Sequence, residues 1–128
     1  MYYQKTIDVP ANTIESNAVV TRLHMTLGTI ERFIVAFPAG CHGLCHVRVN
    51  YQGWQILPWT LGESLAWDNY VFDMQHKYPL AVEPYDLRIV TWNEDDSYLH
   101  RVFVGLILNE NVIEGSNVEL YEALAGMR

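Results

Sequence analysis

The segment Cys41-His42-Gly43-Leu44-Cys45-His46 holds the densest set of potential metal ligands in the sequence. Zinc prefers thiolate and imidazole ligands, and four of them can close a tetrahedral site. The spacing argues against zinc here, because structural sites join two close ligands to two distant ones. Cys45 and His46 also follow each other on an expected strand, so their side chains point to opposite faces. We therefore expect no bound metal, with Cys45 in the core and His46 on the solvated face.

No other pattern in the sequence predicts catalysis. Cupin metal sites need a His-x-His pair, which the five histidines never form. The Gly-x-Ser-x-Gly motif of a nucleophilic serine and the phosphate-binding glycine loops are absent, and neither cysteine carries a signal of activation. The acidic segment Asn93-Glu94-Asp95-Asp96 lacks the spacing of a calcium loop, so we expect a solvated hairpin tip, with a weak calcium site left open. These observations predict a non-enzymatic protein without a cofactor.

Trp54, Trp59 and Trp67 are the aromatic residues with the greatest potential to bind a partner. Three indoles within 14 positions could form a platform on which sugars stack, as on carbohydrate-binding modules. They could also anchor a subunit interface, where Trp is enriched among the residues that dominate binding. A third interpretation is that they fill the core beneath an irregular loop. The sequence leaves these three interpretations open.

The composition is that of a globular protein and limits the partners. Half of the 128 residues are hydrophobic, 18% are charged and the net charge is −7, which fits one domain. An acidic chain without a Lys/Arg cluster is repelled by phosphate backbones and anionic membranes, so we expect neither nucleic acid nor membrane as a partner. No apolar run reaches the roughly 20 residues of a membrane span, and the first residues lack the apolar core of a signal peptide. We expect no Sec-dependent secretion.

Alternating side chains predict strands along most of the chain. In 44–51 the residues Cys45, Val47, Val49 and Tyr51 share one face, and polar residues occupy the other. Turn signals recur about every 8–12 residues, a spacing typical of sandwiches and barrels. We expect an all-β fold, namely an antiparallel β-sandwich that is jelly-roll-like. The expected strands are 3–9, 19–26, 30–37, 44–51, 54–57, 70–74, 86–92 and 98–108, the last being the most apolar and therefore central.

The two ends are expected to differ from the rest of the single domain, which spans 1–128. Residues 1–17 predict an extended N-terminal arm, because a proline and two turn signals separate its strand from the first core strand. The composition changes again in the C-terminal tail, residues 110–128. Within this tail, residues 118–124 could form a short helix.

The N-terminal arm carries Tyr2, Tyr3, Ile7 and Val9, which are too apolar for a free tail. An extended segment that pairs with the open sheet edge of a neighbouring copy satisfies its backbone groups and covers that edge. We therefore expect a homo-oligomer, with a small closed ring such as a trimer favoured. The alternative is a monomer whose arm folds back onto its own sheet.

Two stretches carry a resemblance to known proteins. Phe37-Pro38-Ala39-Gly40 through Gly53-Trp54-Gln55-Ile56, and then Trp92-Asn93-Glu94-Asp95-Asp96, are similar to phage-encoded β proteins. Together with the arm and the lack of a catalytic motif, the layout of residues 1–109 resembles the accessory structural proteins of tailed-phage virions. These are capsid decoration proteins and related head or fibre components.

The resemblance implies a non-enzymatic, self-associating protein that binds the major capsid protein or another virion protein. Such a protein would be made in the host cytoplasm and would reside in the virion. The alternative from another class is a carbohydrate-binding β-sandwich module that uses Trp54, Trp59 and Trp67. Saturable sugar binding that is lost on Trp59→Ala would favour this alternative.

Overall fold

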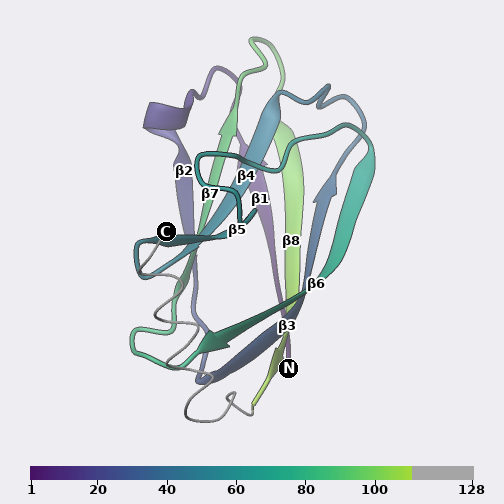
Figure 1. The fold of residues 1–128 in the computed structure, drawn as a ribbon. Helices are drawn as coiled ribbons and strands as arrows, with labels where there is room; N and C mark the ends of the chain where they lie inside the picture. The colour runs from purple at the N-terminus through teal and green to yellow at the C-terminus, as the bar shows by residue number, and fades with distance from the viewer. Residues whose placement is uncertain (111–128) are drawn as a thin grey trace.

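A computed structural model of the chain describes residues 1–110, which are predominantly β-strand (Figure 1). Val, Ile, Phe, Tyr and Thr are frequent in these segments, and such side chains fit a pleated, half-buried surface. The strands are β1 (Tyr2–Val9), β2 (Val19–Leu23), β3 (Gly28–Phe37), β4 (Cys45–Tyr51), β5 (Trp54–Leu57), β6 (Tyr70–Leu80), β7 (Leu87–Asn93) and β8 (His100–Asn109), and a short 3-10 helix, η1 (Glu15–Asn17), precedes β2.

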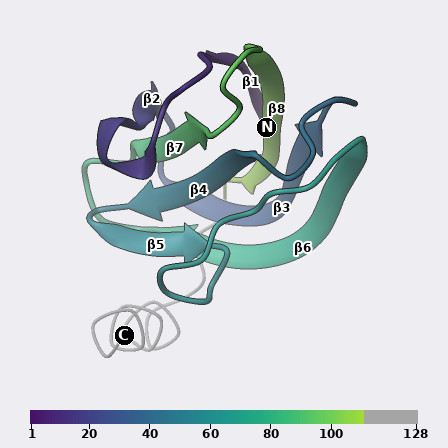
Figure 2. The ribbon, with the colours of Figure 1, turned by 90° about the horizontal axis from the view of Figure 1, so that it is seen from above.

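The strands form two four-stranded sheets that lie face to face (Figure 2). One sheet has the order β1-β8-β3-β6 and the other has the order β2-β7-β4-β5. All neighbouring strands run antiparallel. The expected all-β architecture with antiparallel sheets is therefore confirmed. β8 lies inside its sheet, between β1 and β3, as its apolar sequence predicts.

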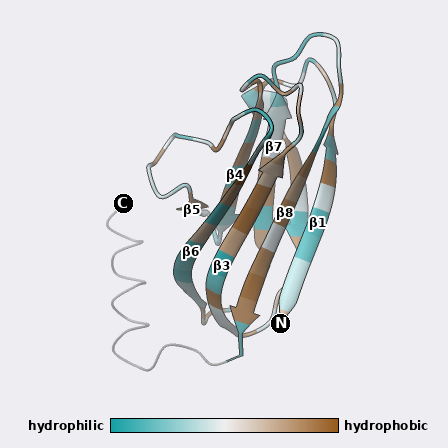
Figure 3. Ribbon diagram, turned by 90° about the vertical axis from the view of Figure 1, so that its right-hand side faces the viewer, coloured by the Kyte–Doolittle hydropathy of each residue, from teal (hydrophilic) through white to brown (hydrophobic). Residues whose placement is uncertain are grey.

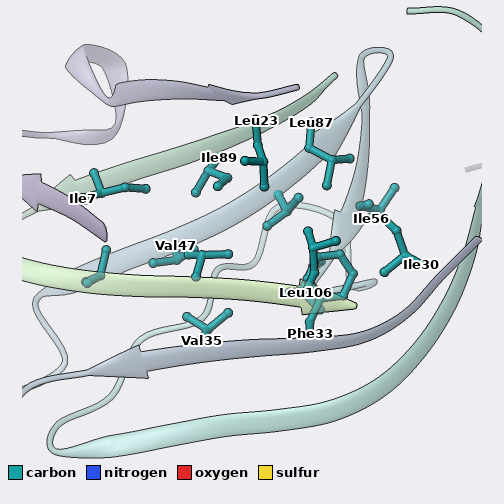
Figure 4. Packing of buried hydrophobic residues seen from close by; sticks show 14 of the residues in the cluster. Ile7, Leu23, Ile30, Phe33, Val35, Val47, Ile56, Leu87, Ile89 and Leu106 are labelled. Carbon is teal, nitrogen blue, oxygen red and sulfur yellow. The ribbon is translucent and has the colours of Figure 1, made fainter. Parts of the chain in front are cut away.

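The hydrophobic core lies between the two sheets. In β4, the alternation expected from the sequence is observed, because every second residue from Cys45 to Tyr51 is buried. Figure 3 shows hydrophobic residues along much of β3 and β8, whereas β1 at the sheet edge is largely hydrophilic. Figure 4 shows side chains from both sheets meeting, among them Phe33 and Leu106 from one sheet and Val47 and Ile89 from the other. Burying one such side chain contributes about 1.5–3 kcal/mol.

The N-terminal segment is a strand of this sheet and not an arm that extends from the domain. β1 pairs with β8 in continuous register from Tyr2↔Ile107 to Val9↔His100. Ile7 and Val9 are buried in the core. The N-terminal segment thus folds back onto its own sheet, which is the alternative to an arm that reaches a neighbouring copy. Pairing within the chain satisfies the backbone groups of β1 and covers the edge of β8.

β6 is longer than the sequence predicted, running from Tyr70 to Leu80 and not only over 70–74. It includes Pro79, which reads as a strand breaker because it lacks a backbone N–H. Proline is tolerated there because β6 is at the edge of its sheet, where an N–H can face away from the neighbouring strand. The helix expected at 118–124 lies outside the described residues.

Candidate binding surfaces

Loops from distant parts of the sequence meet at the upper end of the molecule in Figure 1. These are the connections β1–β2, β3–β4 and β7–β8, together with the residues that precede β6. Backbone hydrogen bonds join them into one surface, so side chains on these loops have fixed neighbours. The bonds run from the N–H of Asn12 to the carbonyl of Asp95 (2.8 Å), from Asn69 to Pro38 (3.3 Å) and from Glu94 to Leu44 (2.8 Å).

Trp67 lies at this end beside a shallow hollow of about 420 Å³, which His42, Gly43 and Asp68 also line. One Asp68 carboxylate oxygen accepts hydrogen bonds from the backbone N–H groups of Gly40 and His42, both at 2.9 Å. These bonds lower the pKa of Asp68 below its ordinary 3.8, and the bond from His42 has the largest effect. The hollow therefore combines an indole face with a carboxylate that is ionised at neutral pH.

The other two tryptophans have different surroundings. Trp54 begins β5, in register with Tyr51, while Trp59 lies near the rings of His76 and Tyr78 at 6.3 and 6.4 Å. The exposed fractions are 41% for Trp54, 43% for Trp59 and 60% for Trp67, which excludes the core interpretation for all three. No ring contact joins any two of these indoles in the described part of the chain. Each of the three indoles therefore has its own surroundings in residues 1–110.

The N-terminal residues expected at an interface divide between core and surface. Ile7 and Val9 are buried within the chain, whereas Tyr2 is exposed and Tyr3 is half-buried. The ammonium group of Met1 donates to the carbonyl of Leu108 at 2.7 Å, which closes the end of the β1–β8 pair. Of these four residues, only Tyr2 and Tyr3 therefore remain accessible for contact with another molecule.

Cys41 and Cys45 are both buried, with free thiols. Removal from water raises the pKa of Cys41 to about 11 and that of Cys45 to about 12, chiefly because burial disfavours a thiolate. Cys45 points into the core while His46 points to the opposite face of β4, as expected from alternation. Within residues 1–110, no three potential ligands lie together in a way that could hold a metal ion.

His46 belongs to a polar cluster that sequence reasoning missed. Its Nδ1 lies 2.9 Å from the Ser64 hydroxyl and its Nε2 lies 3.0 Å from a Glu94 carboxylate oxygen, while the ring stacks on Trp92 at 4.9 Å. Ser64 and Glu94 are thirty positions apart, outside any strand, and no local pattern links them.

The cluster contains the residue types of a Ser-His-carboxylate triad, but its geometry differs from one. In such a triad the serine bonds Nε2, and a buried carboxylate bonds Nδ1 and orients the ring. Here the serine lies at Nδ1, and Nε2 lies near the Glu94 carboxylate without a hydrogen bond to it, while the Glu94 side chain is 51% exposed. The arrangement instead ties the loop that carries Ser64 and the β7–β8 turn to the outer face of β4.

The acidic turn is in part the solvated hairpin tip that we expected, because Glu94 and Asp96 are exposed, but Asn93 and Asp95 are not. Asn93, Asp95 and His100 are buried. One Asp95 oxygen accepts from the N–H groups of Ser97 (2.9 Å) and Tyr98 (3.2 Å), and the other lies 2.8 Å from Nε2 of His100. Because both carboxylate oxygens of Asp95 already contact groups of the protein, we interpret Asp95 as a residue that holds the turn in its conformation.

No helix of the described residues is long and apolar enough to cross a membrane. Neither a protein-family model, nor a curated protein, nor a solved structure matches the chain.

Proposed function

We propose that the two sheets form a jelly roll. The first strand pairs with the last, the second with the seventh, the third with the sixth, and the fourth with the fifth. One long antiparallel hairpin that is rolled into two four-stranded sheets produces this pairing. The strand order supports this finer fold assignment, for which the alternation of side chains is the only indication in the sequence.

On this basis we propose that the chain is a non-enzymatic virion structural protein, a capsid decoration or accessory protein that self-associates and binds the capsid surface. The strand order carries the proposal, because jelly rolls are typical of viral capsid proteins, lectin domains and cupins. The chain lacks the His-x-His pair of cupins. Of the remaining classes, the capsid class fits the resemblance carried by Phe37–Ile56 and Trp92–Asp96.

Exposed aromatic and aliphatic residues at the loop end support a role in association. Trp67, Tyr70, Tyr98 and Leu99 are all exposed there. Their loops are joined by hydrogen bonds, so they present a preformed surface and not a set of independent tips. Exposed apolar groups that gather on a soluble protein mark interaction sites. We propose this loop end as the surface that contacts the capsid.

Proteomic analysis of purified virions from the phage that encodes the chain tests this role. We expect the protein in virions in a fixed ratio to the major capsid protein, and we expect its gene beside the capsid and portal genes. Detection only in infected-cell lysate, with none in gradient-purified virions, would contradict the proposal.

A carbohydrate-binding module is the second candidate, and the hollow beside Trp67 favours it. A flat exposed indole can stack on the apolar face of a sugar ring, while the Asp68 carboxylate can accept hydrogen bonds from hydroxyl groups. A glycan array followed by fluorescence titration tests it. Saturable binding that Trp67→Ala abolishes and Trp54→Ala preserves would support a sugar site, and no binding across the array would reject it.

A further inference from the structure

Two arginines, Arg22 and Arg88, form no ion pair with a carboxylate of residues 1–110. Residues 1–110 contain five arginines, and the chain has 15 acidic residues and a net charge of −7. Three of the arginines form ion pairs, Arg32 with Asp73 (2.6 Å), Arg48 with Glu15 (2.8 Å) and Arg101 with Asp8 (2.6 Å). Arg22 and Arg88 form none with any described carboxylate, although acidic residues are in excess.

The same two arginines lie side by side. Arg22 on β2 is directly opposite Arg88 on β7 in the antiparallel register. Their chain neighbours Leu23 and Leu87 are buried, so both arginines point outward on the same face. The Cβ atoms of directly opposite residues are about 4.5–5.5 Å apart, and like charges in this position destabilise a sheet. An anion bound between the two guanidinium groups would relieve this repulsion.

A hollow of about 180 Å³ opens at this pair, lined by Arg22, Arg88, Gln52, Gly53, Pro84 and Asp86. The one carboxylate on its rim, Asp86, lies 2.9 Å from Nδ1 of His24, a group outside the hollow. The Gln52 amide donates to the carbonyls of Val82 (2.6 Å) and Pro84 (3.2 Å), which fixes the opposite rim. At roughly 30 Å³ per water molecule, the hollow has the volume of about six waters, so a small polar group fits within it.

We propose that Arg22 and Arg88 form a binding site for a phosphate group. Each guanidinium offers a planar fork of N–H donors that fits oxyanions in a bidentate manner. A phosphate monoester carries about −1.5 to −2 charges at pH 7 and three acceptor oxygens, so one such group can serve both forks and neutralise both cations. A single carboxylate supplies only half of this charge. The site lies at the end opposite to the loop surface and is independent of the proposed virion role.

Isothermal titration calorimetry of the full chain with inorganic phosphate, at constant ionic strength, tests the site. We expect saturable binding of one phosphate per chain. Arg22→Gln and Arg88→Gln should each weaken it at least tenfold, and Arg22→Lys should weaken it less because the charge remains. The matched control is Arg101→Gln, which removes an arginine that already has a carboxylate partner and should leave phosphate binding unchanged.

A second measurement separates a ligand site from a structural role. Without phosphate, Arg88→Gln should raise Tm by about 1–3 °C, because it relieves the repulsion between the arginines. Phosphate should raise Tm of the intact chain and not that of Arg88→Gln. Phosphoserine as an additional probe distinguishes an ester-linked phosphate from the free ion. Three results would overturn the proposal: no binding at millimolar phosphate, binding by both glutamine variants as tight as that of the natural chain, or binding of acetate as strong as that of phosphate.

Discussion

Burial determines the chemistry of the two cysteine side chains. Because the pKa of Cys41 is about 11 and that of Cys45 about 12, only a very small fraction of either thiol is ionised near pH 8. We predict that neither thiol of the native chain reacts with a disulfide reagent within minutes, whereas both react at once in guanidinium. The absorbance of the thiolate that the reagent releases measures the rate of this reaction. A rapid reaction of one thiol in the native chain would show an exposed, activated cysteine.

Asp95 stabilises the folded chain as a carboxylate. The N–H of Ser97 and then His100 lower its pKa below 3.8. The stabilisation is therefore fully present above the unfolded-state pKa and is lost as the pH falls through the lower folded-state pKa. We predict that Asp95→Asn lowers the urea midpoint at about pH 7 and that the difference from the natural chain shrinks toward about pH 3.

The neighbouring Asp96→Asn is the matched control for Asp95→Asn, because Asp96 is exposed. It should change the midpoint little at either pH. If the urea midpoint falls equally for the two variants, or if the fall for Asp95→Asn does not depend on pH, the ionised Asp95 does not stabilise the fold.

Sequence reasoning at the residue scale succeeded where a residue's surroundings are local. The opposite faces of Cys45 and His46 follow from strand alternation. The cluster of His46 with Ser64 and Glu94 depends on where two loops fold, which no periodicity encodes. The sequence likewise did not predict whether the three tryptophans are buried or exposed, because an irregular loop has no periodic pattern that marks a buried face.

The strands themselves were largely readable from the sequence. β4 and β7 alternate clearly because one face of each is buried and the other is partly solvated. β6 was underestimated because Pro79 reads as a strand breaker, and only its edge position makes the proline acceptable. Sheet order could not be derived, because it is set by long-range pairing such as β1 with β8, whose partners are about a hundred residues apart.

Gly28 permits the close approach of β3 and β8. A Cβ at this position would lie 2.4 Å from the backbone carbonyl oxygen of Asn109. We predict that Gly28→Ala destabilises the chain by about 1–3 kcal/mol, because the strands must separate to accept the methyl group. Urea unfolding measures this. Val71→Ala, at an exposed position of β6, is the control and should change stability by less than about 0.5 kcal/mol. Equal midpoints for the two variants would contradict this explanation of the glycine.

The whole molecule is predicted to be a homo-oligomer, with a trimer favoured. Within one chain β1 completes its own sheet, so the self-association expected from the N-terminal segment must use exposed residues such as Tyr2, or an exchange of β1 between copies. Light scattering of the intact chain at micromolar concentration should give three times the mass of one chain. The mass of a single chain under these conditions would refute the oligomer.

Removal of residues 1–10 shows what β1 contributes to the whole molecule. The truncation deletes Ile7 and Val9 from the core and exposes the edge of β8. We predict a large loss of stability and a tendency to aggregate, because an uncovered apolar strand edge pairs with other chains. Thermal unfolding followed by circular dichroism checks this prediction. An unchanged Tm and an unchanged mass would mean that β1 is dispensable for both folding and association.

The most direct test of the proposed function is co-sedimentation of the purified chain with capsids assembled from the major capsid protein of the same genome. We predict that the chain pellets with capsids, that binding saturates at a fixed ratio, and that replacing Tyr98 and Leu99 at the loop end with serine weakens it at least tenfold. Val82→Ser, at an exposed position of the β6–β7 connection at the other end of the molecule, should bind like the natural chain. A chain that remains in the supernatant at every capsid concentration would contradict a role on the capsid.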